Sequence, residues 1–172
     1  MGFPKTAPTR YLLLVTGAWL VVFLLTRILL LVTHLDEVSG NLLPVFGVGL
    51  LYDLGFLAYA ALPLGLYLLL CPPALWRRRG HRWFLQAVLT VSLFAMLFTS
   101  VAEWLFWDEF GVRFNFIAVD YLVYSKEVLN NLLESYPIGK LLSLLAVMAI
   151  VLSLALRKPF NAAMNAPLPA MR

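Results

Sequence analysis

The feature that most constrains this sequence is a series of four long apolar segments. They cover residues 11–32, 45–70, 83–107 and 138–156. At about 1.5 Å per residue in a helix, each can cross the roughly 30 Å hydrocarbon core of a bilayer. Because lipid offers no hydrogen-bonding partners to the backbone, each segment is predicted to be an α-helix. The sequence therefore predicts an all-α, polytopic membrane helix bundle of about four transmembrane helices.

Composition agrees with this class and argues against several others. Of the 172 residues, 62% are hydrophobic and 13% are charged, whereas soluble domains are about 45–50% apolar and about 25% charged. The basic residues between the second and third segments form one short cluster, without the extended basic face that would predict nucleic acid as a partner. The single cysteine, Cys71, excludes an intramolecular disulfide and a multi-cysteine metal site. We expect no cofactor in this chain.

Local signals refine the domain plan. Residues 1–160 are predicted to form the transmembrane domain, and Pro63 should kink its second helix. Ala58, Ala61 and Gly65 place small side chains on one face of that helix, which favours close helix packing. Residues 161–172 are rich in alanine, proline and asparagine, and are predicted to be a cytoplasmic linker or tail.

The distribution of charge predicts an orientation. None of the nine acidic residues falls in a segment assigned to the basic side of a four-helix topology. Cytoplasmic loops of membrane proteins carry an excess of lysine and arginine, so both termini are predicted to be cytoplasmic. The basic residues assigned to that side are Lys5, Arg10, Arg77, Arg78, Arg79, Arg82, Arg157, Lys158 and Arg172.

Three ionisable residues, Arg27, Asp53 and Glu103, lie within the apolar segments at similar depth from the outer face. A charge there costs roughly 2.5–3.5 kcal/mol on insertion scales, so such residues usually face the bundle interior and have partners. We predict that Arg27 lies within reach of Asp53 or Glu103. One interpretation is an ion-pair network that locks the first three helices together. The other is a pocket for a phospholipid headgroup, with Arg27 facing the phosphate and the carboxylates orienting it.

The loop 108–137 is the longest connection, and its apolar residues follow helical spacing. It is predicted to form an extracytoplasmic, helical loop in the outer interface between the third and fourth helices. Two roles remain open, a structured connector that caps the bundle or a surface that meets lipid headgroups or another domain. The candidate residues within it are Arg113, Asn115, Asp120, Tyr121 and Tyr124.

The run Arg-Phe-Asn-Phe-Ile-Ala-Val-Asp-Tyr-Leu-Val-Tyr at residues 113–124 carries a family resemblance. With its flanks over 106–139, it resembles the outer-face loop of bacterial lipoteichoic-acid-synthase-like proteins. The four predicted helices are also similar in order and spacing to that family's membrane domain. The resemblance implies a location in the bacterial cytoplasmic (inner) membrane.

The resemblance also implies a larger architecture, a five-helix membrane domain followed by an extracytoplasmic domain of the alkaline phosphatase/sulfatase superfamily. Such a domain transfers phosphoglycerol or phosphoethanolamine from a phospholipid to an acceptor, using a metal-activated threonine. This sequence stops in the linker after the fourth helix, so we expect the fifth helix, the nucleophile and the metal ligands to be absent. No catalytic residue is assigned, and we expect no activity from this chain alone.

Three functions follow as hypotheses. The first is a domain that anchors a transferase, binds membrane phospholipid and serves a catalytic domain in cis or in trans. The second is a stand-alone four-helix accessory or scaffold protein that acts through partner binding. The third, a small transporter, is disfavoured because the sequence shows no internal repeat.

Overall fold

The computed structural model describes residues 6–35, 42–112 and 136–169 of the chain. Within these ranges every regular element is an α-helix, which confirms the predicted all-α bundle. Four of the described helices are long and apolar enough to cross a membrane, so the chain is a multi-pass membrane protein. They are α1 (Ala7–Thr33), α2 (Leu43–Ala60), α5 (Arg79–Phe110) and α8 (Ile138–Ala155).

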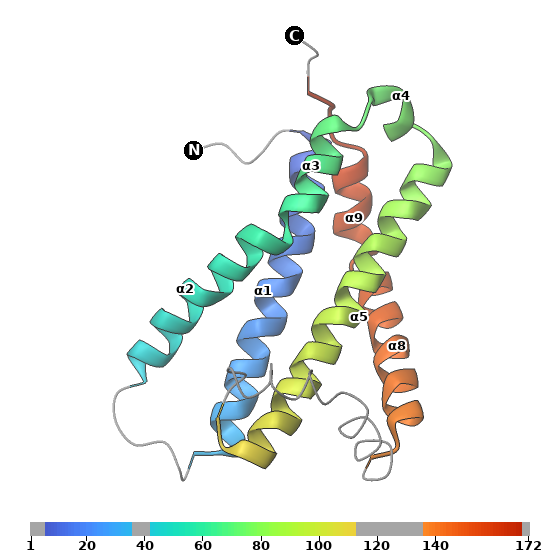
Figure 1. Cartoon of the computed structure of the whole chain (residues 1–172). Helices are drawn as coiled ribbons and strands as arrows, with labels where there is room; N and C mark the ends of the chain where they lie inside the picture. Colours follow the sequence, from blue (N-terminus) through green and yellow to red (C-terminus); the bar gives the residue numbers. More distant parts are fainter. Residues whose placement is uncertain (1–5, 36–41, 113–135, 170–172) are drawn as a thin grey trace.

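A proline breaks the second segment. α2 ends at Ala60, and α3 (Leu62–Leu70) continues the chain in a different direction (Figure 1). Pro63 has no N–H to donate to the carbonyl of Tyr59, and its ring crowds that carbonyl, so the helix bends in the turn before it. The kink predicted at Pro63 is confirmed. As a result α3 packs on α1, while α2 leans away from it (Figure 1).

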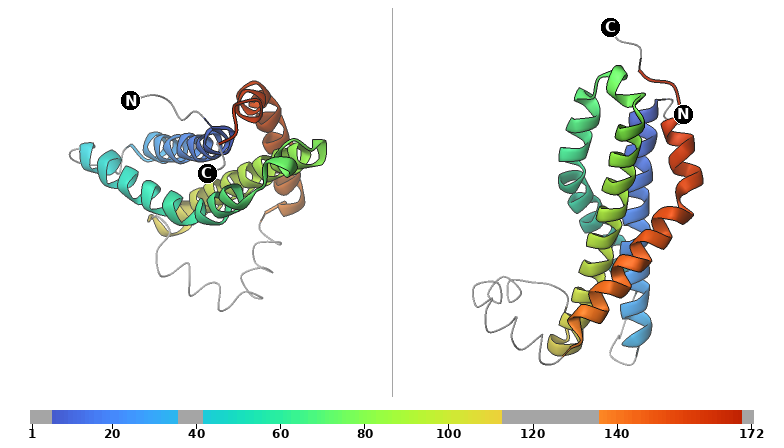
Figure 2. Two further views of the ribbon diagram at one scale, coloured as in Figure 1. Left: turned by 90° about the horizontal axis from the view of Figure 1, so that it is seen from above. Right: turned by 90° about the vertical axis from the view of Figure 1, so that its right-hand side faces the viewer.

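A second proline breaks the fourth segment. α8 ends at Ala155, and α9 (Arg157–Met164) follows after Leu156. Pro159 has no N–H to donate to the carbonyl of Ala155, so the helix breaks in the turn before it, as it does before Pro63. The break lets the segment change neighbours, because α8 packs on α5 and α9 packs on α1 (Figure 2).

The helix α9 corrects the prediction of a linker over residues 161–172, which is wrong for residues 161–164. Phe160, Ala163 and Met164 are spaced i, i+3, i+4 and are buried at 4%, 3% and 6% exposure. This short apolar face packs against the start of α1, where Tyr11 meets Phe160 edge to face at 6.0 Å. Burial of that face holds the segment in place despite its loop-like composition.

Backbone and side-chain hydrogen bonds close this end of the bundle. The N–H of Ala7, in the first turn of α1, donates to the carbonyl of Pro167 at 2.9 Å. The indole N–H of Trp76, in α4 (Pro73–Trp76), donates to Met164 O at 3.4 Å. The first turn of α1, α4 and the end of α9 therefore lie at one end of the molecule (Figure 1).

The ends of α5 also differ from prediction. The helix begins at Arg79, four residues before the apolar stretch at Trp83, because arginine side chains can extend to the interface while the helix continues. It continues to Phe110, and Gly111 ends it in a left-handed conformation at φ 64°. Residues 108–110 of the predicted interfacial loop are thus helical, and residues 113–135 lie outside the described part.

The packing of α9 predicts a stability effect. Phe160→Ala should lower the free energy of unfolding by about 3 kcal/mol, since a buried aromatic ring is removed. The matched control is Leu144→Ala on α8, where the side chain is 56% exposed and the loss should stay below about 0.5 kcal/mol. Unfolding in mixed micelles by titration with a denaturing detergent measures both. Equal losses would contradict the packed position of α9.

Candidate functional site

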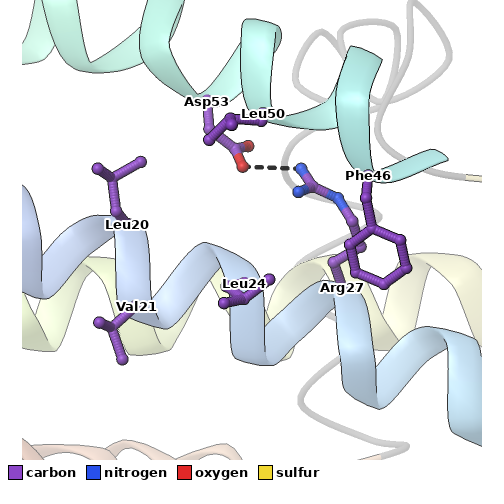
Figure 3. A pocket seen from close by; sticks show the side chains of 7 residues that line it. All are labelled: Leu20, Val21, Leu24, Arg27, Phe46, Leu50 and Asp53. Atoms are coloured by element: carbon purple, nitrogen blue, oxygen red, sulfur yellow. Dashed lines mark hydrogen bonds and ion pairs between the residues drawn. The ribbon is translucent and has the colours of Figure 1, made fainter. Parts of the chain in front are cut away.

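The buried charges of α1 and α2 form an ion pair. Arg27 Nη2 lies 2.8 Å from Asp53 Oδ2, and the two side chains are 6% and 11% exposed (Figure 3). This confirms the prediction that Arg27 lies within reach of one of the two carboxylates. A contact of this length is a charge-assisted hydrogen bond, which is among the stronger polar contacts in proteins.

The pair stands in the wall of a groove between the two helices. On each helix three of the lining residues are spaced i, i+4 and i+7, and the last of these three is the ionisable one. These stripes face each other, which is why an arginine and an aspartate 26 positions apart in the sequence meet. The groove has a volume of about 300 Å³ and is lined by Leu20, Val21, Leu24, Arg27, Phe46, Leu50 and Asp53 (Figure 3).

A glycine makes room for the guanidinium. A Cβ added at Gly49 would come closer to the Arg27 side chain than real Cβ atoms essentially ever approach. Gly47, one half-turn earlier on α2, has open space at the same position. Gly49 is therefore a site residue that the sequence analysis missed, because its role depends on a side chain from another helix.

The guanidinium keeps unused hydrogen-bonding capacity. Arginine carries five N–H donors in a planar fork, and one nitrogen of Arg27 is engaged by Asp53. Its Nε is buried and has no hydrogen-bond partner among the described residues. A buried donor without a partner costs about 1–3 kcal/mol. The site therefore favours an additional acceptor oxygen beside Arg27.

Thr26, the residue before Arg27, attaches the other side of α1 to α5. Thr26 is buried, and its hydroxyl donates to Ser100 Oγ on α5 at 2.8 Å. Consecutive residues of a helix point about 100° apart, so Thr26 and Arg27 reach different neighbours. α1 is thus held to α5 by one side chain and to α2 by the next.

The remaining predicted residues fall into two groups. Glu103 is buried on α5 at 8% exposure, as expected, but the groove lining comes from α1 and α2. The participation of Glu103 in this site therefore stays a prediction. The loop candidates Arg113, Asn115, Asp120, Tyr121 and Tyr124 lie outside the described residues.

Comparisons of the chain with protein-family models, curated proteins and solved structures found no match. The site is therefore interpreted from its own geometry and chemistry.

The ion pair predicts a double-mutant result. Arg27→Leu should lower the free energy of unfolding by about 3–5 kcal/mol, because Asp53 is left buried without its partner. Arg27→Leu/Asp53→Leu should recover most of that loss, since an apolar pair of similar volume replaces the charges. Denaturing-detergent titration measures both variants. A double variant as unstable as Arg27→Leu alone would exclude Asp53 as the partner.

Gly49 gives an independent test of the same geometry. Gly49→Ala should cost about 1–3 kcal/mol, because the new methyl group displaces the Arg27 side chain. Gly47→Ala is the matched control and should be neutral or stabilising by about 0.5–1 kcal/mol, as alanine favours a helix. In the Arg27→Leu/Asp53→Leu background the cost of Gly49→Ala should shrink. A cost that persists unchanged would place the clash elsewhere.

Proposed function

We propose that this chain is a membrane-anchoring domain that binds a phospholipid and presents it to a phosphoglycerol- or phosphoethanolamine-transferring catalytic domain, in cis or in trans. The resemblance of residues 106–139 to lipoteichoic-acid-synthase-like proteins suggests the reaction class. The observation that carries the lipid-binding role is the buried Nε of Arg27, without a partner among the described residues, beside an otherwise apolar groove.

A phospholipid has the chemistry that such a groove requires. Its phosphate oxygens accept hydrogen bonds from a guanidinium fork, and charge-assisted bonds of this kind are the strong ones. Asp53 holds Arg27 by one nitrogen, and a carboxylate can also accept from the hydroxyls of a phosphoglycerol headgroup. The acyl chains would lie along the exposed apolar faces of the two helices, which include Val21 and Leu51 at 56% and 69% exposure.

The position along the membrane normal suits delivery to an extracytoplasmic domain. Arg27 lies six residues before the end of α1, so about 9 Å below that helix end. The opposite end of the bundle carries the basic residues that follow α4 and those at the starts of α5 and α9, and the positive-inside rule predicts that this end is cytoplasmic. The groove then opens in the outer half of a bacterial inner membrane.

The part that this chain plays is binding and orientation. Arg27 would fix the phosphate, Asp53 would fix Arg27, and the apolar walls would exclude water from both. The transfer reaction belongs to the catalytic domain. A stand-alone scaffold protein is the alternative, and a lipid-binding measurement separates the two.

The proposal predicts a loss of lipid binding that is independent of stability. Arg27→Leu/Asp53→Leu should bind phosphatidylglycerol about tenfold more weakly than the parent chain, because a charge-assisted hydrogen bond contributes about 1.5–3 kcal/mol. Native mass spectrometry of the detergent-solubilised chain measures the affinity, with Gly47→Ala as the control. If the folded double variant binds phosphatidylglycerol as tightly as the parent chain, the ion pair has a structural role only, and the stand-alone scaffold protein is favoured.

A further inference from the structure

A second groove lies at the opposite end of the bundle, and three arginines converge on it. They come from the first turn of α5 and from the start of α9, with the junction between α8 and α9 as the far wall. Its volume is about 440 Å³, within the range of about 300–1,000 Å³ that is common for ligand sites. The lining residues are Arg79, Arg82, Trp83, Gln86, Leu154, Arg157, Phe160 and Asn161.

No side-chain carboxylate from the same segments balances this charge. The sequence has no aspartate or glutamate between Asp53 and Glu103, and none after Glu134. Gathering like charges costs free energy unless a counterion is near. The groove therefore favours an anion.

One of the arginines is oriented without being neutralised. Arg82 donates from Nη2 to Asn161 Oδ1 at 3.1 Å and from Nη1 to Asn165 Oδ1 at 3.3 Å. Both acceptors are side-chain amides, one within α9 and one at its C-cap, so they fix the guanidinium while leaving its full positive charge. This differs from the first site, where Asp53 neutralises Arg27.

The other walls indicate a lipid and disfavour a small soluble anion. Trp83 is 72% exposed and Leu154 is 55% exposed. An indole ring at this level is typical of the membrane–water interface. From Leu154 the exposed apolar face of α8 continues through Val151 and Val147, both 57% exposed. An acyl chain has a continuous apolar path there below a phosphate held by the arginines.

A polar cluster closes the floor of the groove between α5 and α8. Gln86 donates from Nε2 to Ser153 Oγ and to the Ser153 carbonyl. Thr90 Oγ1 lies 2.7 Å from Ser153 Oγ, within hydrogen-bonding distance. These contacts join α5 and α8 beginning one turn along α5 from Arg82, next to the arginines.

From this arrangement we infer that the groove formed by Arg79, Arg82 and Arg157 binds the phosphate of an anionic glycerophospholipid from the leaflet at the basic end of the bundle. Basic pockets between transmembrane helices are known to take such headgroups. The inference does not depend on the proposed function, because the two grooves lie at opposite ends of the bundle and share no residue.

The test uses two matched pairs of charge removals in the full chain. Arg79→Gln/Arg157→Gln removes two exposed arginines that line the groove, and Arg77→Gln/Arg78→Gln removes two exposed arginines of the same cluster that do not. Both are made in the Arg27→Leu/Asp53→Leu background, so that the first groove does not contribute. Native mass spectrometry with short-chain phosphatidylglycerol and with phosphatidylcholine gives the affinities, and thermal unfolding in detergent confirms folding.

The groove pair should weaken phosphatidylglycerol binding about tenfold, and the control pair should change it less than about twofold. Phosphatidylcholine binding should change little in either. If the groove pair fails to fold, Arg157→Gln alone gives the same comparison against Arg78→Gln. Equal losses in the two pairs would overturn the site in favour of diffuse surface charge. Glycerol phosphate that binds as tightly as the lipid would overturn the lipid assignment.

Discussion

The ion pair between Arg27 and Asp53 determines where α2 lies. The buried residues of that helix are Asp53 and Leu57, and its other contacts with α1 come from partly exposed side chains such as Phe56, which meets Phe23 edge to face. Within a bilayer no hydrophobic driving force presses such a helix against its neighbours, since lipid chains are as apolar as leucine. The charged contact, the close approach that Gly49 permits and the Phe23–Phe56 ring pair therefore fix the position of α2 relative to α1. A groove beside them follows from the same geometry.

Two prolines divide the molecule into a closed end and an open end. Pro63 turns α3 onto α1, and Pro159 turns α9 onto α1. At the closed end, Ala7 and Pro167 join the first turn of α1 to the segment that follows α9. At the open end α2 leans away (Figure 1), and Arg27 reaches Asp53 on it (Figure 3). The kinks thus place one groove among packed helix ends and the other between two separated helices.

Much of this architecture could be predicted from sequence, because its causes are local or strongly penalised. Long apolar runs must be helices in lipid, and a buried arginine without a partner would be costly, so Arg27 had to lie near a carboxylate. The rest depends on side chains from distant segments. Gly49 could not be distinguished from the other glycines, 10 in all, because its role depends on the Arg27 side chain from another helix. The apolar face of α9 spans five residues, from Phe160 to Met164, too few for periodicity to outweigh a loop-like composition.

The positions of Arg27 and Asp53 on two consecutive helices affect how the bundle is inserted into the membrane. The span in α2 has a mean hydropathy of 1.5, against 2.3 for the span in α1, and it carries Asp53. Alone in the bilayer, that helix would bear the cost of an unpaired carboxylate. Arg27 precedes it in the chain and meets it as an antiparallel neighbour, so the two charges can enter lipid together as a neutral pair. During synthesis, α2 is then inserted at the least cost together with α1, as the second helix of a helical hairpin.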